Sequence, residues 1–285
     1  MEAPMVWVFV LAAVCMCAVA ATMVFAAISD VRSREVDDIH WKAVIAVGIP
    51  CSAAAAMEES TALPAVLMAL SSVFMALHVL TDALPWPASL IVSGAFAVLS
   101  YCSAEGIQGR WTLLAPFVSS LMFLFMYRFR VLAGGADAKA LIALAMVPQY
   151  PSIPGIPAVW QVGWPLSAVP LSVSVLVMAV MLSLVPMLLL GIRNALEGSY
   201  GPRMFTEYRM PLDDVRGSFV WLAEDMEDGE VIRRRVMDDV DNSLSKLDDA
   251  GITDVAVTPM VPFVLYIAAG LLVVLLLGNP LFAVL

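Results

Sequence analysis

Long apolar stretches, separated by short polar segments, run through most of the chain. Charged residues rarely interrupt them, and a helix that crosses a bilayer needs about 20 consecutive apolar residues. The pattern therefore predicts eight membrane helices, the sixth being the shortest. The expected spans are 4–29, 41–57, 63–81, 85–103, 111–131, 137–148, 166–192 and 259–284.

The first apolar stretch resembles a signal peptide in its position, but not in its pattern. No Lys or Arg precedes it, and it exceeds the usual apolar core of about 7–15 residues. We therefore expect it to be retained as a membrane helix.

Composition agrees with the pattern. Hydrophobic residues make up 61% of the chain and charged residues 14%, and the mean hydropathy is +0.90. Soluble domains contain about 45–50% apolar and about 25% charged residues. We predict an all-α integral membrane protein, a polytopic helical bundle that carries a small α/β subdomain.

The subdomain is the one extended polar stretch, residues 193–258, with a strand-like run at Ser218–Leu222 and a helical pattern around Glu230–Ala250. Gly251 is a typical helix C-cap signal, and an alternating run at Ile252–Thr258 predicts another strand. The predicted organisation is thus 1–192 for membrane helices, 193–258 for an acidic cytoplasmic subdomain, and 259–285 for the final membrane helix.

Basic residues predict the orientation of the chain. If eight spans alternate, Arg110 lies on one side of the membrane and every other Lys and Arg lies on the opposite side. Cytoplasmic segments carry the excess of basic residues. We therefore expect a multi-pass protein of the cytoplasmic membrane whose two termini are outside and whose 193–258 segment is cytoplasmic.

Within 193–258, acidic residues outnumber basic ones. Such a surface should repel nucleic acid and anionic lipid headgroups, so we expect no nucleic-acid partner. It could attract a basic partner, or it could simply be a solvated acidic face.

Two aspartates are the candidates for chemistry, because acidic side chains at membrane level are costly and often functional. Asp30 ends the first span, and Asp137 follows the pair Gly134-Gly135. The predicted topology places both at the cytoplasmic side, where two close carboxyl groups would share one proton. Asp82 is a third, weaker candidate on that side.

Each aspartate also has a purely structural explanation. Asp137 could be the N-cap of the next helix, and Asp30 could belong to an interfacial charge cluster. A transporter that uses the aspartates for protons or cations is a functional alternative, although transporter sites lie near the bilayer midplane. A scaffold subunit of a secretion machine would need neither carboxylate.

Two motifs, however, resemble a known family. Asp30-Val31-Arg32-Ser33-Arg34-Glu35-Val36-Asp37-Asp38 looks like the first catalytic segment of archaeal preflagellin and type IV prepilin peptidases. Gly134-Gly135-Ala136-Asp137-Ala138-Lys139 resembles their G-x-G-D segment, which presenilin-type proteases share. Gly191-Ile192-Arg193-Asn194 and Val257-Thr258-Pro259-Met260-Val261-Pro262 are further similarities, in the family's order.

The resemblance implies a membrane-embedded aspartic endopeptidase with Asp30 and Asp137 as the catalytic pair and Gly134, Gly135 and Lys139 supporting the motif. It implies precursor substrates with short basic leader peptides, archaellins or type IV pilin-like proteins, cut at the cytoplasmic face among membrane lipids. It implies no cofactor and no metal. The enzymatic alternative is a protease similar to presenilin or signal-peptide peptidase, which the Arg-rich first motif disfavours.

Two features depart from the family pattern. Ala136 stands where the motif has its second glycine, so a positive φ at this position would be a problem. The interval between the aspartates is also long, and we expect an extra helical hairpin within 58–110, added to a six-span core. The four cysteines (Cys15, Cys17, Cys51 and Cys102) form no C-x-x-C pattern, and His40 and His78 lack a third metal ligand.

Overall fold

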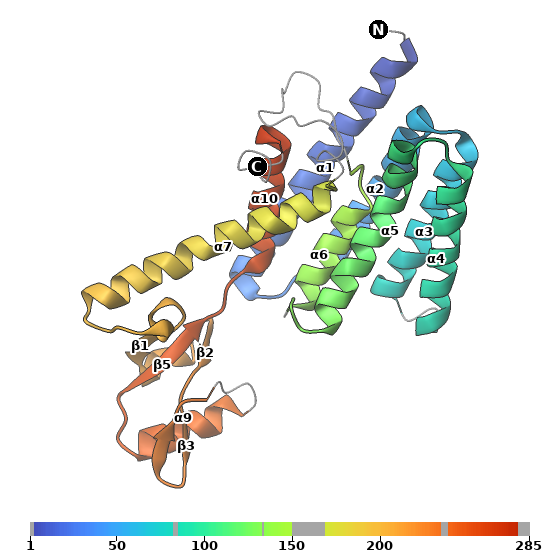
Figure 1. Cartoon of the computed structure of the whole chain (residues 1–285). Coiled ribbons are helices and arrows are strands. Elements are labelled where there is room, and N and C mark those ends of the chain that lie inside the picture. The colour runs from blue at the N-terminus through green and yellow to red at the C-terminus, as the bar shows by residue number, and fades with distance from the viewer. Residues whose placement is uncertain (1–2, 82–84, 133, 150–168, 235–238, 279–285) are drawn as a thin grey trace. The chain divides into compact units, whose positions relative to one another are not determined.

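The computed structural model describes residues 3–81, 85–132, 134–149, 169–234 and 239–278. Eight apolar helices correspond to the eight expected spans (Figure 1). They are α1 (Ala3–Ser33), α2 (Asp38–Glu59), α3 (Ala62–Leu80), α4 (Trp86–Ser103), α5 (Ile107–Arg128), α6 (Gly135–Ala145), α7 (Leu171–Leu196) and α10 (Phe263–Leu277). Among the described residues, α1, α2, α3, α5 and α7 are long and apolar enough to cross a membrane. The chain is therefore a polytopic helical protein, as predicted.

The first helix is longer than its predicted range. Asp30 does not end it, because α1 continues to Ser33. The Ser33 hydroxyl donates to the carbonyl oxygens of Ser29 and Glu35, at 3.0 and 3.1 Å, and so holds the turn after the helix. Polar residues that the hydropathy pattern places outside the span are thus still helical.

The sixth helix is short because protein surrounds it. Ala140 to Val147 are all buried, and α6 contacts α2, α3, α5 and α10. A helix that is apolar on all sides belongs inside a protein, and one enclosed in this way need not have the length that a lipid-exposed span requires. Its C-terminal carbonyl groups are satisfied by Gln149, whose side-chain nitrogen donates to Leu144 O at 2.9 Å and Ala145 O at 3.0 Å.

Small residues let the neighbouring helix approach α6. A Cβ at Gly48 of α2 would lie 3.1 Å from the carbonyl oxygen of Met146. The Ser52 hydroxyl donates to the same carbonyl at 2.9 Å. Small side chains and hydroxyl bonds of this type are the usual means of packing helices in a membrane.

Helices α3 and α4 pack along each other as a hairpin within residues 58–110, the range in which the extra hairpin is expected (Figure 1). Ser71 and Ser93 link them through a hydroxyl contact of 3.3 Å, and Ser93 also donates to Ser71 O at 2.9 Å. Nearer the α3–α4 turn, His78 Nδ1 lies 2.8 Å from the Ser89 hydroxyl.

By its internal contacts, the chain divides into a membrane unit (residues 1–182 and 263–285) and a C-terminal unit (residues 183–262). The C-terminal unit contains an antiparallel three-stranded sheet in the order β1-β5-β2 and a two-stranded hairpin, β3-β4. Their bounds are β1 (Tyr208–Pro211), β2 (Val220–Leu222), β3 (Asp225–Glu227), β4 (Glu230–Ile232) and β5 (Asp254–Pro259). Helix α9 (Val240–Asp249), the short α8 (Leu212–Val215) and a 3-10 turn, η2 (Pro202–Phe205), complete it.

The helix predicted around Glu230–Ala250 is partly wrong. Residues 230–232 form strand β4, and α9 begins only at Val240. The turn before β4 is Asp228-Gly229, with φ of 51° and 82°. An Asp-Gly pair with positive φ at both positions is a strong hairpin signal, which the helical pattern obscured.

The end of α9 is as predicted. Gly251 has φ +73°, its N–H donates to Asp248 O at 2.8 Å, and the N–H of Ile252 donates to Leu247 O at 3.0 Å. These two bonds form a Schellman motif, which requires a left-handed residue that glycine adopts at little cost.

Candidate active site

Asp30 lies in the last turn of α1 and is 9% exposed. Its carboxylate accepts a hydrogen bond of 3.2 Å from the backbone N–H of Val264, 234 positions later in the chain. Val264 is in the first turn of α10, where N–H groups have no partner within the helix and the helix dipole favours negative charge. The Arg34 guanidinium also attracts the Asp30 carboxylate. Both neighbours stabilise a negative charge on Asp30.

Asp137 is not the N-cap of α6. That position is occupied by Gly134, and Asp137 lies three residues later in the first turn. The Asp137 carboxylate accepts a hydrogen bond from the Gly134 N–H, as an acidic residue does at this position of a capping box. A Cβ built on Gly134 would lie 2.2 Å from an Asp137 carboxylate oxygen. A side chain at position 134 would therefore displace the carboxylate of Asp137 from this position.

The alanine at the second glycine position of the motif causes no strain. Ala136 is inside α6, and residues with positive φ do not include it. Its side chain packs against the buried core of the membrane unit. Gly135, in turn, has room for a methyl group, because a Cβ there would be 3.6 Å from the Tyr127 hydroxyl, an ordinary contact.

The fold brings the two candidate carboxylates together, although 107 positions separate them in the sequence. Helix α10 packs against both α1 and α6, and the Asp30 and Asp137 carboxylates are close enough to repel each other electrostatically. The repulsion between the two carboxylates is removed when they share one proton. One carboxyl can then donate a proton while the other accepts one.

The last residue of the second motif, Lys139, forms an ion pair with Asp38 of α2. Its ammonium group lies 2.7 and 2.9 Å from the two carboxylate oxygens. The two side chains are 32% and 34% exposed. This pair joins the segment that follows Asp30 to the segment that carries Asp137.

Of the remaining candidates, those that the structure describes have local structural contacts. Asp82 lies outside the described residues. Asp37 is the N-cap of α2 and accepts the Ile39 N–H at 3.0 Å, and His40 Nδ1 is 3.1 Å from Asp37 O. Within the part of the chain that the structure describes, no three His, Cys, Asp or Glu residues gather as metal ligands would.

The contact of Val264 with the site could not be predicted from the sequence, because it is made by the backbone N–H and does not depend on the type of residue. The one available signal was the Pro-containing segment just before α10, which marks where that helix begins. The motif 191–194 has a structural role in the C-terminal unit. A Cβ at Gly191 would collide with the Phe205 ring at 2.3 Å, and buried Asn194 donates to Met204 O and Glu207 O at 2.6 and 2.7 Å.

Comparison with known families gives one match. Residues 202–279 match the family model Archaeal Peptidase A24 C-terminus Type II. The matched segment starts in the C-terminal unit and includes α10 with Val264, the residue that contacts Asp30. No curated protein matches the chain. Over residues 202–279 the chain is therefore similar to the C-terminal part of archaeal A24 peptidases, in agreement with the resemblance of its two aspartate motifs.

Proposed function

We propose that this chain is an aspartic endopeptidase in which Asp30 and Asp137 form the catalytic pair. The observation that carries the proposal is the meeting of these two carboxylates, from separate motifs, within one membrane unit. Each is held by a backbone N–H, from Val264 and Gly134 respectively. As a pair, one carboxyl group would act as the general acid and the other as the general base, as aspartic proteolysis requires.

In the proposed reaction, ionised Asp30 removes a proton from a water molecule that attacks the scissile carbonyl carbon. Protonated Asp137 gives its proton to the carbonyl oxygen, so that a neutral tetrahedral diol forms. The proton taken up by Asp30 then passes to the departing amine nitrogen, the diol returns a proton to Asp137, and the C–N bond breaks. Val264 N–H and Arg34 favour the ionised form of Asp30, which is why we assign it as the base.

For the substrate, we propose the basic leader peptides of archaellin or type IV pilin-like precursors, cut at the cytoplasmic face. The family match supports precursor processing in general. The acidic excess of residues 193–258 would favour encounter with a basic leader. The distribution of Lys and Arg predicts that this segment and both aspartates are on the cytoplasmic side.

The test is cleavage by purified full-length chain of a panel of archaellin and pilin-like precursors, scored by the N-termini of the products. We expect one new N-terminus, directly after the basic leader and before the apolar segment. Cuts inside the apolar segment would instead indicate a protease similar to presenilin. No cleavage of any precursor by well-folded chain would contradict the proposal and favour a transporter or scaffold.

A further inference from the structure

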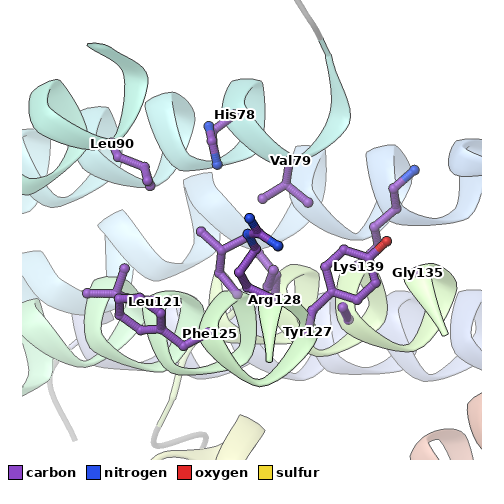
Figure 2. Close-up of a pocket in the computed structure, with 12 residues that line it drawn as sticks. His78, Val79, Leu90, Leu121, Phe125, Tyr127, Arg128, Gly135 and Lys139 are labelled. Atoms are coloured by element: carbon purple, nitrogen blue, oxygen red, sulfur yellow. The ribbon is translucent and has the colours of Figure 1, made fainter. Parts of the chain in front are cut away.

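A cavity of about 400 Å³ lies between α3, α4, α5 and α6 in the membrane unit. This volume is within the range of small-molecule sites, about 300–1,000 Å³. Its walls are mainly apolar, with Leu90, Leu121, Leu124 and Ile142 among the lining residues. Four residues with polar side chains, His78, Tyr127, Arg128 and Lys139, also line it (Figure 2).

The cavity is separate from the catalytic pair. Gly135, Ala138 and Ile142 line it from α6, and their spacing of three and four residues places them on one face of the helix. Asp137 follows Gly135 by two positions and precedes Ala138 by one, so it projects from a different side. Asp137 is accordingly not among the lining residues.

The charge at the cavity is positive. Among the described lining residues there are two cations and no carboxylate. Lys139 already has Asp38 as its partner. Arg128, in the last turn of α5, forms no ion pair within the described residues. Figure 2 shows its guanidinium between α5 and the helix that carries His78 and Val79. Arg128 is exposed, so its guanidinium is accessible to an anionic group that enters the cavity.

We propose that this cavity binds an acidic phospholipid, with an acyl chain along the apolar wall and the phosphate held by Arg128. A basic leader peptide does not fit, because Arg128 and Lys139 would repel it. A zwitterionic lipid would fill the apolar space, but its own ammonium group would compete with the guanidinium for the phosphate. Basic pockets between membrane helices are suited to anionic headgroups, and guanidinium binds phosphate through two parallel hydrogen bonds.

The experiment measures lipid binding to the full chain by native mass spectrometry, with phosphatidylglycerol and phosphatidylcholine of identical acyl chains. We expect the acidic lipid to bind about tenfold more tightly, since hydrogen bonds to charged groups are worth about that factor or more. Arg128→Gln should remove this preference. Arg130→Gln is the matched control, because it loses the same charge two residues later, at an exposed position outside the cavity lining.

A second variant tests the apolar half of the site. Val79→Phe should reduce binding of both lipids by filling the cavity, and soluble glycerol phosphate should not compete at the concentrations where the lipid saturates. Equal binding of the two lipids would overturn the proposal. So would equal losses in the two arginine variants, unchanged binding by Val79→Phe, or displacement of the lipid by an apolar precursor segment. None of these measurements depends on protease activity.

Discussion

The membrane unit and the C-terminal unit differ in how completely their buried carboxylates are paired. In the C-terminal unit, buried Glu224 is 3% exposed and has three partners: Ala256 N–H at 2.8 Å, Arg233 at 3.2 Å and Arg209 at 3.5 Å. In the membrane unit, buried Asp30 has one backbone N–H donor, from Val264, and one nearby guanidinium, from Arg34, and it faces a second carboxylate, Asp137, that repels it.

The difference separates structural carboxylates from candidate catalytic ones. A buried charge that serves stability is fully paired, because an unpaired one costs several kcal/mol. Two close carboxylates repel each other, and this repulsion lowers the stability of the fold. Ionisable groups in such unfavourable surroundings are typical of functional sites. The family match lies mostly in the C-terminal unit, whereas the proposed chemistry lies in the membrane unit.

The largest effect should come from removing one acid of the proposed pair. We expect Asp30→Asn and Asp137→Asn each to reduce cleavage by about 10³-fold or more, because an amide can neither take up nor release the catalytic proton. Asn keeps the side-chain volume and an oxygen acceptor, so helicity and insertion should not change. The measurement is precursor cleavage by purified variants. Substantial turnover by either one would exclude the aspartic mechanism and return a transporter or scaffold to consideration.

A smaller loss should follow from displacing Asp137 without changing its chemistry. In Gly134→Ala, the new methyl group would lie 2.2 Å from the carboxylate oxygen, which must move. Misplacement of about 1 Å can cost about 10²-fold in rate, and we expect a fall in kcat of about 10- to 100-fold. Gly135→Ala is the matched control, with its nearest contact at 3.6 Å. If both variants cleave equally well, the carboxylate of Asp137 need not hold this position.

The ion pair between Asp38 and Lys139 should have a moderate effect. Asp38→Asn or Lys139→Gln should lower kcat by about fivefold, since a partly exposed pair contributes about 1 kcal/mol. The double variant should be no worse than either single variant, because both remove one interaction. Asp37→Asn is the control, since Asn caps a helix as well as Asp. Additive losses in the double variant would show that the two residues act independently.

The smallest effect concerns the pH dependence of the C-terminal unit. Burial tends to raise the pKa of Asp225, but bonds from Ser243 and the Met226 N–H, with Arg234 and Lys246 nearby, place its pKa below the ordinary value of 3.8. A carboxylate with a lowered pKa in the folded state stabilises the fold above its unfolded pKa, and this contribution is lost as pH falls through the folded value.

Asp225→Asn should therefore destabilise the C-terminal unit by about 1 kcal/mol at neutral pH, and the difference from wild type should shrink only below about pH 4. Hydrogen exchange of β3 and α9 measures it. Glu230→Gln is the control, because Glu230 is exposed on the neighbouring strand. A difference between wild type and Asp225→Asn that stays constant down to pH 2 would contradict the assignment.

The membrane helices could be predicted from sequence because each needs only a local apolar run. The short length of α6 was also predicted from its apolar run, but its burial by four neighbouring helices could not be. The candidate acids could be found from their motifs, and Gly134 from its place before Asp137. The contact from Val264 to Asp30 and the Asp38–Lys139 pair could not, because they join segments that only the tertiary fold brings together.

The contact between Asp30 and α10 also bears on how the protein is made. Asp30 precedes its hydrogen-bond donor, Val264, by 234 positions, so it leaves the ribosome well before that donor. Until α10 has been synthesised and inserted, Asp30 lacks this donor, and the surroundings that favour its ionised form are incomplete. In the proposed mechanism, a nascent chain would therefore remain without full proteolytic activity until α10 has been translated and inserted.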